Sequence, residues 1–381
     1  MPSLFDRLFG AEGEPEPEAP QQRESPATLA PPADGSLFGY LRIAREAGAS
    51  DVLLQAGSVP YARLEGALVR FDTAALDAPR ADIVAAALCK LGGQPARGLD
   101  SDFCIEVEDL GRFRVNVHHQ RGGWAASAKI IPLRLPTLET LALPAELAEL
   151  TAFRQGLVLV TGPANSGKSS TLAAFLAHVN GTRAEHVVTI EDPIEFVFAS
   201  DRANVTQRQV GPHTRTFGGA LRAALREDPD IVLVSELRDL ETIRTAIVAA
   251  ETGHLVMGTL HTRDAISTIN RVVDLFPARE QPQVRTMLAG TLRAVLSQVL
   301  LPRKGGGRRV CAYELLRVTP AAATHIREAR THQLLSLLQT GRRHGMIDLD
   351  ARLQQLVAEG LIDRATARDA AKDPDRFGEE V

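Results

Sequence analysis

A glycine-rich segment that carries a lysine and two hydroxyls has the spacing needed to bind phosphate. Residues 162–170 read GPANSGKSS and contain the pattern G-x-x-x-x-G-K-[ST]. Glycines let successive backbone N–H groups face phosphate oxygens, the lysine reaches the β and γ phosphates, and the serine hydroxyl binds Mg²⁺. The aliphatic run LVLVT precedes the segment and a helical stretch follows it, as phosphate binding at a helix N-terminus requires. The sequence therefore predicts that ATP and Mg²⁺ bind here, at Gly162, Pro163, Ala164, Asn165, Ser166, Gly167, Lys168, Ser169 and Ser170.

Residues that could act on a bound phosphate accompany three further aliphatic runs, HVVTI, DIVLV and HLVMGTL. Ligands of parallel sheets bind at the carboxyl ends of the strands. We expect the polar residues there to converge on the glycine-rich segment, where a carboxylate could order the attacking water. These residues are Glu191, Asp192 and Glu195 after the first run, Glu236 after the second and His261 after the third, with His254 just before the third.

A single acid after a strand is more often a helix cap or a solvated charge than a catalytic group, and only the convergence of three strand ends favours catalysis. Asp230 precedes its aliphatic run. It should therefore lie at the opposite edge of the sheet and serve as a cap or turn residue.

The elements that position these residues alternate between buried strands and helices from about residue 137. Short continuous aliphatic runs joined by helices are typical of a parallel sheet covered on both faces. We expect strands in 156–162, 186–193, 230–236 and 254–261, separated by helices in 169–180, 218–228, 240–253 and 264–276. Residues from about 320 to the end are predicted to be helical.

Residues 37–136 are typical of a smaller α/β domain, and the first 36 residues differ from it. The run RFRVNV alternates, so that Arg112, Arg114 and Asn116 lie on one face of a strand. Residues 1–36 hold seven acidic and two basic residues and many prolines, which predicts disorder. Within them SLFDRLF could form one helical face that docks on a partner, although a frayed terminus is the simpler interpretation.

Composition excludes several classes of protein. The net charge is −4 and no basic stripe with interleaved aromatics occurs, which argues against nucleic acid as a partner. No apolar stretch approaches the length of a membrane span. Cys89, Cys104 and Cys311 form no CxxC pair, so we expect reduced thiols in a cytoplasmic protein.

The segments together resemble the secretion ATPase superfamily, and within it the PilT-like ATPases that retract type IV pili in twitching motility. VTIEDPIE looks like the Asp box of that family, IVLVSE like its atypical Walker B motif and GHLVMGTLH like its His box. The resemblance covers roughly residues 37–375. The four-cysteine zinc module of pilus-assembly and type II secretion ATPases is missing, which favours the retraction branch.

The resemblance implies a PAS-like domain over 37–136, a RecA-like P-loop ATPase core over 137–320 and a helical region over 321–381. It also implies a homohexameric ring, with ATP between subunits, that acts on an inner-membrane pilus platform protein. The resemblance assigns phosphate and Mg²⁺ binding to Lys168 and Ser169. Glu236 would polarise water and contribute to the metal site, and Glu195 would support metal and water. His261 and His254 would couple the γ-phosphate to domain position, and Arg112 and Arg114 would contact a neighbour's nucleotide.

Four departures from the family pattern leave alternatives open. Asn165 and Ser235 stand where the family usually has glycine, and Lys129 stands where it has arginine. The retraction-associated motif appears as AAATHIRE, in which only Ile326, Arg327 and Glu328 are kept. Asparagine tolerates positive φ, so the loop should survive. The alternatives are a hydrolysis-weakened paralogue that regulates a related retraction ATPase, and a pilus-extension or type II secretion ATPase.

Overall fold

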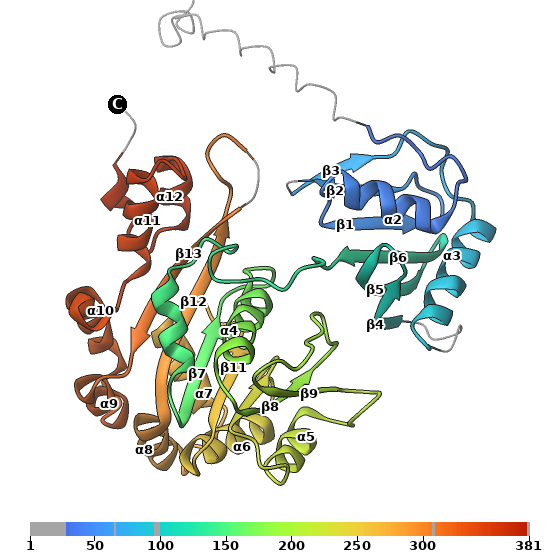
Figure 1. The fold of residues 1–381 in the computed structure, drawn as a ribbon. Coiled ribbons are helices and arrows are strands. Elements are labelled where there is room, and N and C mark those ends of the chain that lie inside the picture. The colour runs from blue at the N-terminus through green and yellow to red at the C-terminus, as the bar shows by residue number, and fades with distance from the viewer. Residues whose placement is uncertain (1–27, 65, 95–99, 307–308, 379–381) are drawn as a thin grey trace, which may run out of the picture.

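The computed structural model describes residues 28–64, 66–94, 100–306 and 309–378. Its strands form a six-stranded sheet early in the chain and a seven-stranded sheet later. The two sheets occupy different parts of the molecule and are joined by the extended segment that follows β6 (Figure 1). The prediction of an α/β fold is therefore confirmed.

The first sheet is antiparallel throughout, in the order β3-β2-β1-β6-β5-β4. Its strands are β1 (Asp51–Gln55), β2 (Tyr61–Leu64), β3 (Ala67–Arg70), β4 (Asp100–Val107), β5 (Gly111–Gln120) and β6 (Gly123–Ile130). Helices α2 (Leu37–Glu46) and α3 (Ala78–Leu91) contribute to the same hydrophobic core. Ser36 and Asp77 cap these helices, since each side chain accepts a hydrogen bond from a backbone N–H of the first turn.

Strand β5 alternates as its sequence predicts. Phe113 and Val115 are fully buried, whereas Arg112 and Arg114 on the other face are only half-buried. The opposite face of this strand is therefore free to present two guanidinium groups toward the second sheet.

The acidic tail is described only from residue 28, since residues 1–27 lie outside the described residues. Leu29 forms a bridge with Phe71, and its carbonyl accepts a hydrogen bond of 2.8 Å from the backbone N–H of Asp72. Pro32 packs against Gly39 so closely that a Cβ at Gly39 would lie 2.3 Å from the Cβ of Pro32. Residues 28–36 therefore pack onto the first sheet, which corrects the expectation that the disordered segment extends to residue 36. The possible helical face in SLFDRLF lies outside the described residues.

The second sheet has the order β13-β12-β7-β11-β10-β8-β9, and only β13 is antiparallel to its neighbour. The four strands expected from the sequence are β7 (Gly156–Thr161), β8 (His186–Glu191), β10 (Ile231–Val234) and β11 (Leu255–Leu260). The remaining three strands were not expected from the sequence; they are β9 (Asn204–Gln209), β12 (Leu292–Leu301) and β13 (Val310–Arg317). The prediction of a mainly parallel sheet is confirmed.

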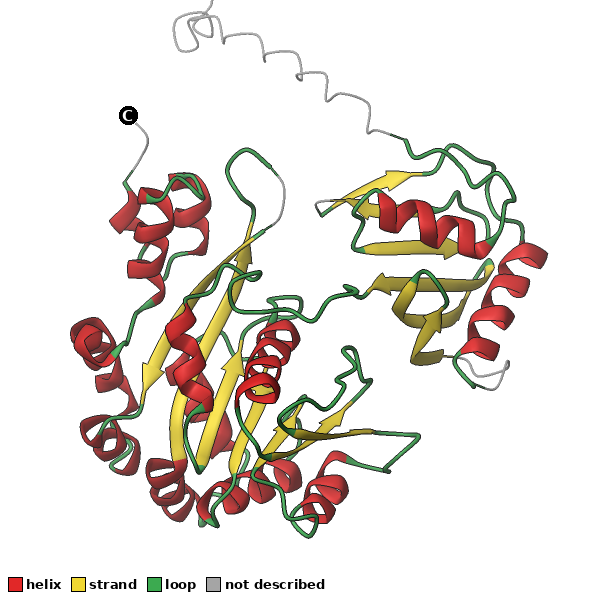
Figure 2. Ribbon diagram, viewed as in Figure 1, coloured by secondary structure: helices red, strands yellow, loops and turns green. Residues whose placement is uncertain are grey.

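Helices cover both faces of this sheet (Figure 2). Side chains of β7 alternate between two cores: Leu157 and Leu159 pack in one, and Val158 and Val160 in the other. The first core is closed by helices α5 (Phe217–Ala224), α6 (Leu240–Glu251), α7 (Ala265–Asp274), α8 (Gln281–Thr291) and α9 (Pro320–Arg327). The second is closed by the helices η1 (Ala145–Thr151) and α4 (Lys168–Thr182).

The predicted C-terminal helices are present and pack on the second sheet. Ile326 of α9 belongs to the core on one face of the sheet, and Leu353 packs with Ala312 of β13. The elements after α9 are η2 (Thr331–Gln333), α10 (Leu334–Thr340), η3 (Gly341–His344), α11 (Leu349–Ala358), α12 (Arg364–Ala370) and η4 (Pro374–Phe377). Among the described residues, no helix has the length and apolar character that crossing a membrane requires.

Candidate active site

The glycine-rich loop joins β7 to α4 in a backbone conformation that depends on its residue types. Gly162 has φ 145° and Gly167 has φ 92°, both in the region that favours glycine. A Cβ at Gly162 would lie 2.2 Å from the backbone oxygen of Gln298 on β12. Asn165 adopts φ 61°, so the prediction that asparagine accepts a left-handed conformation here is confirmed. The loop therefore keeps its curl without a glycine at position 165.

Lys168 begins α4 and turns its ammonium group back over the loop. Its Nζ donates hydrogen bonds to the backbone oxygens of Gly162 at 2.9 Å and Pro163 at 2.8 Å. Burial lowers the pKa of Lys168, and the nearby carboxylate of Glu236 offsets part of that effect. Ser166 places a buried Oγ in the loop without a hydrogen-bond partner. A curled backbone, a buried cation and an unpartnered hydroxyl are the groups that a triphosphate would satisfy.

Glu236 and His261 meet at the carboxyl ends of β10 and β11, next to Lys168. His261 Nε2 lies 3.2 Å from Glu236 Oε1, and His261 Nδ1 lies 3.4 Å from Lys168 Nζ. These contacts fit a histidine that accepts from the lysine through Nδ1 and donates to the carboxylate through Nε2. The structure thus brings together three predicted residues, in a chain from the loop to the Walker B carboxylate.

Arg238 is a member of this cluster that sequence analysis did not select. Its Nε lies 2.8 Å from Glu236 Oε1. Burial raises the pKa of Glu236. The hydrogen bond and charge of Arg238, together with His261, lower it by more than burial raises it, so that the net shift is downward. The only signal in the sequence was its position two residues after Glu236, which places both side chains on the same side of an extended segment.

Glu195 lies beyond β8, in contact with the first sheet. Arg114 of β5 donates through Nη1 to Glu195 Oε1 at 3.2 Å and through Nη2 to Asp102 Oδ2 at 2.7 Å. The Glu195 side chain is only 14% exposed, so this contact neutralises a carboxylate that has little water around it. Asp102 orients Arg114 and was not anticipated from the sequence.

Arg112 makes a second contact with the same segment. Its Nη2 donates to the backbone oxygen of Ile194 at 2.7 Å. Lys129 of β6 lies opposite Arg114 of β5 in the strand register, so the substituted lysine lies beside the two arginines on one face of the sheet. Both arginines thus bind the Asp-box segment of the same chain. Their contact with a neighbour's nucleotide stays a prediction.

Glu191 is the last residue of β8 and a nearly buried carboxyl. Its Oε1 accepts hydrogen bonds from Thr189 Oγ1 at 2.6 Å and from Gln207 Nε2 at 3.0 Å. Burial raises its pKa, and the two hydrogen bonds offset only part of that rise. Asp192, by contrast, is exposed. Glu191 therefore supports the strand end, whereas Asp192 is accessible to solvent.

Ser169 and Ser235 keep positions at the edge of the site. Ser169 is the exposed second residue of α4, as a metal-binding hydroxyl would need to be. The backbone N–H of Ser235 donates to Ile190 at 2.9 Å, and its carbonyl accepts from Thr259 Oγ1 at 2.5 Å. The Walker B segment therefore remains paired at the sheet edge with serine in place of glycine.

His254 and Asp230 lie at the other edge of the sheet. The carbonyl of His254 accepts from the backbone N–H of Gly156, the first residue of β7, and its Nδ1 lies 3.1 Å from the carbonyl of Ala249 at the end of α6. The whole length of β11 separates His254 from the loop, roughly 20 Å at the rise of a strand. His254 therefore lies away from the loop of its own subunit, and its predicted coupling of the γ-phosphate to domain position finds no supporting contact there. Asp230 lies at the opposite edge of the sheet from the loop, as predicted, and its Oδ2 accepts a hydrogen bond of 2.9 Å from the backbone N–H of His186, the first residue of β8.

Comparison with known proteins identifies relatives of this chain. The PilT retraction ATPase of type IV pili from Pseudomonas aeruginosa is 47% identical over 342 residues, which cover 88% of this chain and 98% of that protein. The type IV pilus ATPase PilU of the same organism is 34% identical, over 87% of this chain and 88% of its own. A crystal structure of the pilus retraction motor PilT with bound ADP superposes with a TM-score of 0.78 and 43% identity, over 90% of this chain and 98% of that one.

The family described as Type II/IV secretion system protein matches residues 135–372. This match spans the loop, both carboxylates, His261 and most of the C-terminal helices. Since it covers more than half of the chain, the protein belongs to the Type II/IV secretion system protein family.

Proposed function

We propose that this chain is a PilT-like motor that hydrolyses ATP and drives the retraction of type IV pili. The observation that carries the proposal is the pair of side-chain contacts from Lys168 to His261 and from His261 to Glu236. They join the phosphate loop to a carboxylate able to activate water. The identity of 47% with PilT along nearly its full length supports retraction as the work that hydrolysis performs.

Each side chain has a distinct task in this proposal. Lys168 would exchange the loop carbonyls for phosphate oxygens. Ser169 and Glu195 would hold Mg²⁺, which would neutralise charge on the phosphates. Glu236 accepts a proton from the attacking water while Arg238 and His261 keep it ionised. The unpartnered Ser166 hydroxyl and the glycines of the loop fit a bound triphosphate.

Work on a pilus also requires assembly. We propose a homohexameric ring in which a domain over about 37–136 moves against a core over 137–320 that carries the helices of 321–381. In the ring, Arg112 and Arg114 reach a neighbour's nucleotide, and the assembly acts at an inner-membrane platform protein. Arg114 must then leave Glu195 and Asp102, so its present contacts describe a state in which it holds its own subunit.

Three of the four departures from the family pattern give no reason to prefer a hydrolysis-weakened regulator. Asn165 keeps the left-handed conformation, Ser235 keeps its sheet-edge hydrogen bonds, and Lys129 keeps a cation beside Arg114. Identity with PilU, at 34%, is also lower than identity with PilT. We therefore retain the proposal that this chain is an ATP-hydrolysing motor and not a hydrolysis-weakened regulator.

The test is the ATPase rate of Glu236→Gln in the purified chain. Loss of the base should lower the rate at least about 100-fold, while binding of a fluorescent ATP analogue persists. The matched control is Glu251→Gln, which changes an exposed glutamate at the far end of α6 and should leave the rate unchanged. A Glu236→Gln variant that hydrolyses ATP as fast as the parent would refute the proposal.

Retraction itself is tested in cells. A strain that lacks this chain should fail to retract pili, and the parent sequence should restore retraction where Lys168→Ala does not. Restoration by Lys168→Ala would show that phosphate binding by this loop is not what drives retraction.

A further inference from the structure

A second concave site lies at the edge of the large sheet opposite the phosphate loop. This cavity is open to solvent on one side and has a volume of about 770 Å³, within the range of small-molecule sites. Gln155 precedes β7, Arg293 begins β12 and Arg317 ends the antiparallel β13, so all three line the cavity at the amino ends of the parallel strands. The cavity thus shares no residue with the ATP site.

The lining of this cavity is basic. Four arginines and two glutamates line it, so that cations exceed anions by two before His344 is counted. The arginines come from the segment before β7, from β12, from β13 and from η3; they are Arg154, Arg293, Arg317 and Arg343. Because these elements are distant in sequence, the fold gathers this charge at one place.

Two of the guanidinium groups are held in position with donors to spare. Arg293 donates through Nε to the carbonyl of Gln155 at 3.0 Å and through Nη1 to that of Gly290 at 3.2 Å. Arg317 donates through Nη2 to Glu149 at 2.9 Å, while its Nε is buried without a partner. A guanidinium has five N–H donors, so both groups can still bind an anion. Their fixed orientation reduces the entropy lost on binding.

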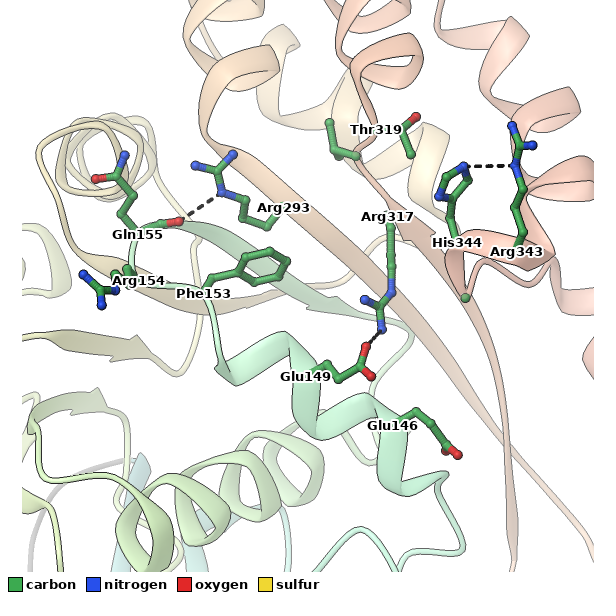
Figure 3. Close-up of a pocket in the computed structure, with 12 residues that line it drawn as sticks. Glu146, Glu149, Phe153, Arg154, Gln155, Arg293, Arg317, Thr319, Arg343 and His344 are labelled. Carbon is green, nitrogen blue, oxygen red and sulfur yellow. Dashed lines mark hydrogen bonds and ion pairs between the residues drawn. The ribbon is translucent and has the colours of Figure 1, made fainter.

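An aromatic ring completes the wall. Figure 3 shows the ring of Phe153 directed into the space between Arg293 and Arg317, with Glu149 below and His344 beyond. Val318 adds aliphatic surface. The cavity therefore offers charged contacts on several sides and an apolar surface for a carbon skeleton.

We propose that this cavity binds a compact anionic small molecule that carries two or more phosphate or carboxylate groups. Arg293 and Arg317 bind the anionic groups through charge-assisted hydrogen bonds, and Phe153 packs against the remainder of the ligand. Such a ligand joins η3 of the C-terminal region to the start of β12. Its binding consequently stabilises the packing of the C-terminal helices on the sheet.

The test uses the full chain carrying Lys168→Ala, so that the phosphate loop does not compete for the probes. Pyrophosphate and citrate are titrated separately by isothermal calorimetry. We expect saturable binding of at least one probe, with an affinity that falls as salt increases. Arg293→Gln and Arg317→Gln should each weaken it about tenfold, the usual effect of removing one charge-assisted contact.

The matched control is Arg342→Gln, which removes an exposed arginine of η3 that does not line the cavity and should leave the affinity unchanged. If Arg317→Gln unfolds, as circular dichroism would reveal, Arg343→Gln takes its place, because Arg343 lines the cavity and is exposed. Pyrophosphate binding alone indicates a phosphate compound, and citrate binding indicates a carboxylate compound.

Two outcomes overturn the proposal. They are absence of binding by both probes, and binding that Arg342→Gln weakens as much as Arg293→Gln does. If both probes fail, a synthetic peptide with the glutamate-rich sequence of residues 11–27 is titrated in the same way, and its binding would identify the cavity as a docking site for an acidic segment instead of a small molecule. All readouts are made on a chain without a working phosphate loop, so they stand apart from the proposed motor function.

Discussion

Replacing Gly162 by alanine tests whether the loop geometry binds the nucleotide. Gly162 has φ 145°, a conformation that L side chains rarely adopt. A Cβ there would lie 2.2 Å from the carbonyl oxygen of Gln298 and 2.6 Å from Ser166 Oγ. The nearer atom is backbone of a central strand, so it has little freedom to move away. The methyl group must therefore displace the loop.

The size of the effect can be estimated from these two penalties. A residue forced into a disfavoured backbone region costs about 1–3 kcal/mol. Adding a methyl group to a filled site costs about 1–3 kcal/mol more. The lower entropy of the unfolded alanine chain returns up to about 1 kcal/mol. Gly162→Ala should thus destabilise the domain by about 1–6 kcal/mol, or lower its melting temperature by roughly 3–18 °C.

The assay pairs thermal melting with titration of a fluorescent ATP analogue. Gly181→Ala is the matched control, since Gly181 lies in the last turn of α4, away from the loop, and an added Cβ there would have no heavy atom within 4 Å. Helix propensity predicts that the control is as stable as the parent or more so, with nucleotide binding intact. If Gly162→Ala melted within about 2 °C of the parent and bound the analogue equally well, the steric reasoning would be wrong.

The remaining predictions concern charge at the strand ends. Arg238→Gln should raise the pKa of Glu236, because burial then acts with less opposition; the acid limb of the pH–rate profile should move to higher pH, and an unmoved limb would contradict this. Glu191→Gln should stabilise the fold at pH 8 more than at pH 5. Burial raises the pKa of Glu191, so the parent loses stability as the pH rises through that raised value and the buried carboxyl ionises. Equal urea midpoints for variant and parent at both pH values would refute this prediction. His261→Ala should lower the ATPase rate about tenfold or more, whereas His254→Ala should change it less than twofold and cost about 1 kcal/mol of stability, for one lost hydrogen bond.

Local patterns determine what the sequence could reveal. The phosphate loop requires its glycines and lysine at fixed spacing, so the motif and its flanking elements were predictable. The parallel arrangement followed from continuous aliphatic runs, and it placed Glu236 and His261 at one edge. Asn165 could be assigned a left-handed conformation because few other residues tolerate it.

Features that depend on distant segments could not be predicted in this way. Strand β9 is NVTQRQ, whose polar residues carry no alternation, so only its pairing with β8 defines it. The clamp of Asp102, Arg114 and Glu195 joins two sheets, and nothing local marks Asp102 as its third member. His254 shares a motif with His261, yet strand length alone places the two at opposite edges.

The contacts of the Asp-box segment explain how the position of the first sheet could govern catalysis. Arg112 binds the carbonyl of Ile194 and Arg114 binds the carboxylate of Glu195, so one strand of the first sheet holds two successive residues next to the site. Any rotation that withdraws Arg114 leaves Glu195, which is 14% exposed, without its counter-charge. That loss is costly unless another cation replaces the guanidinium. A metal ion on the phosphates would supply this charge, so in the proposed motor ligand binding and movement of the first sheet would favour one another through this carboxylate.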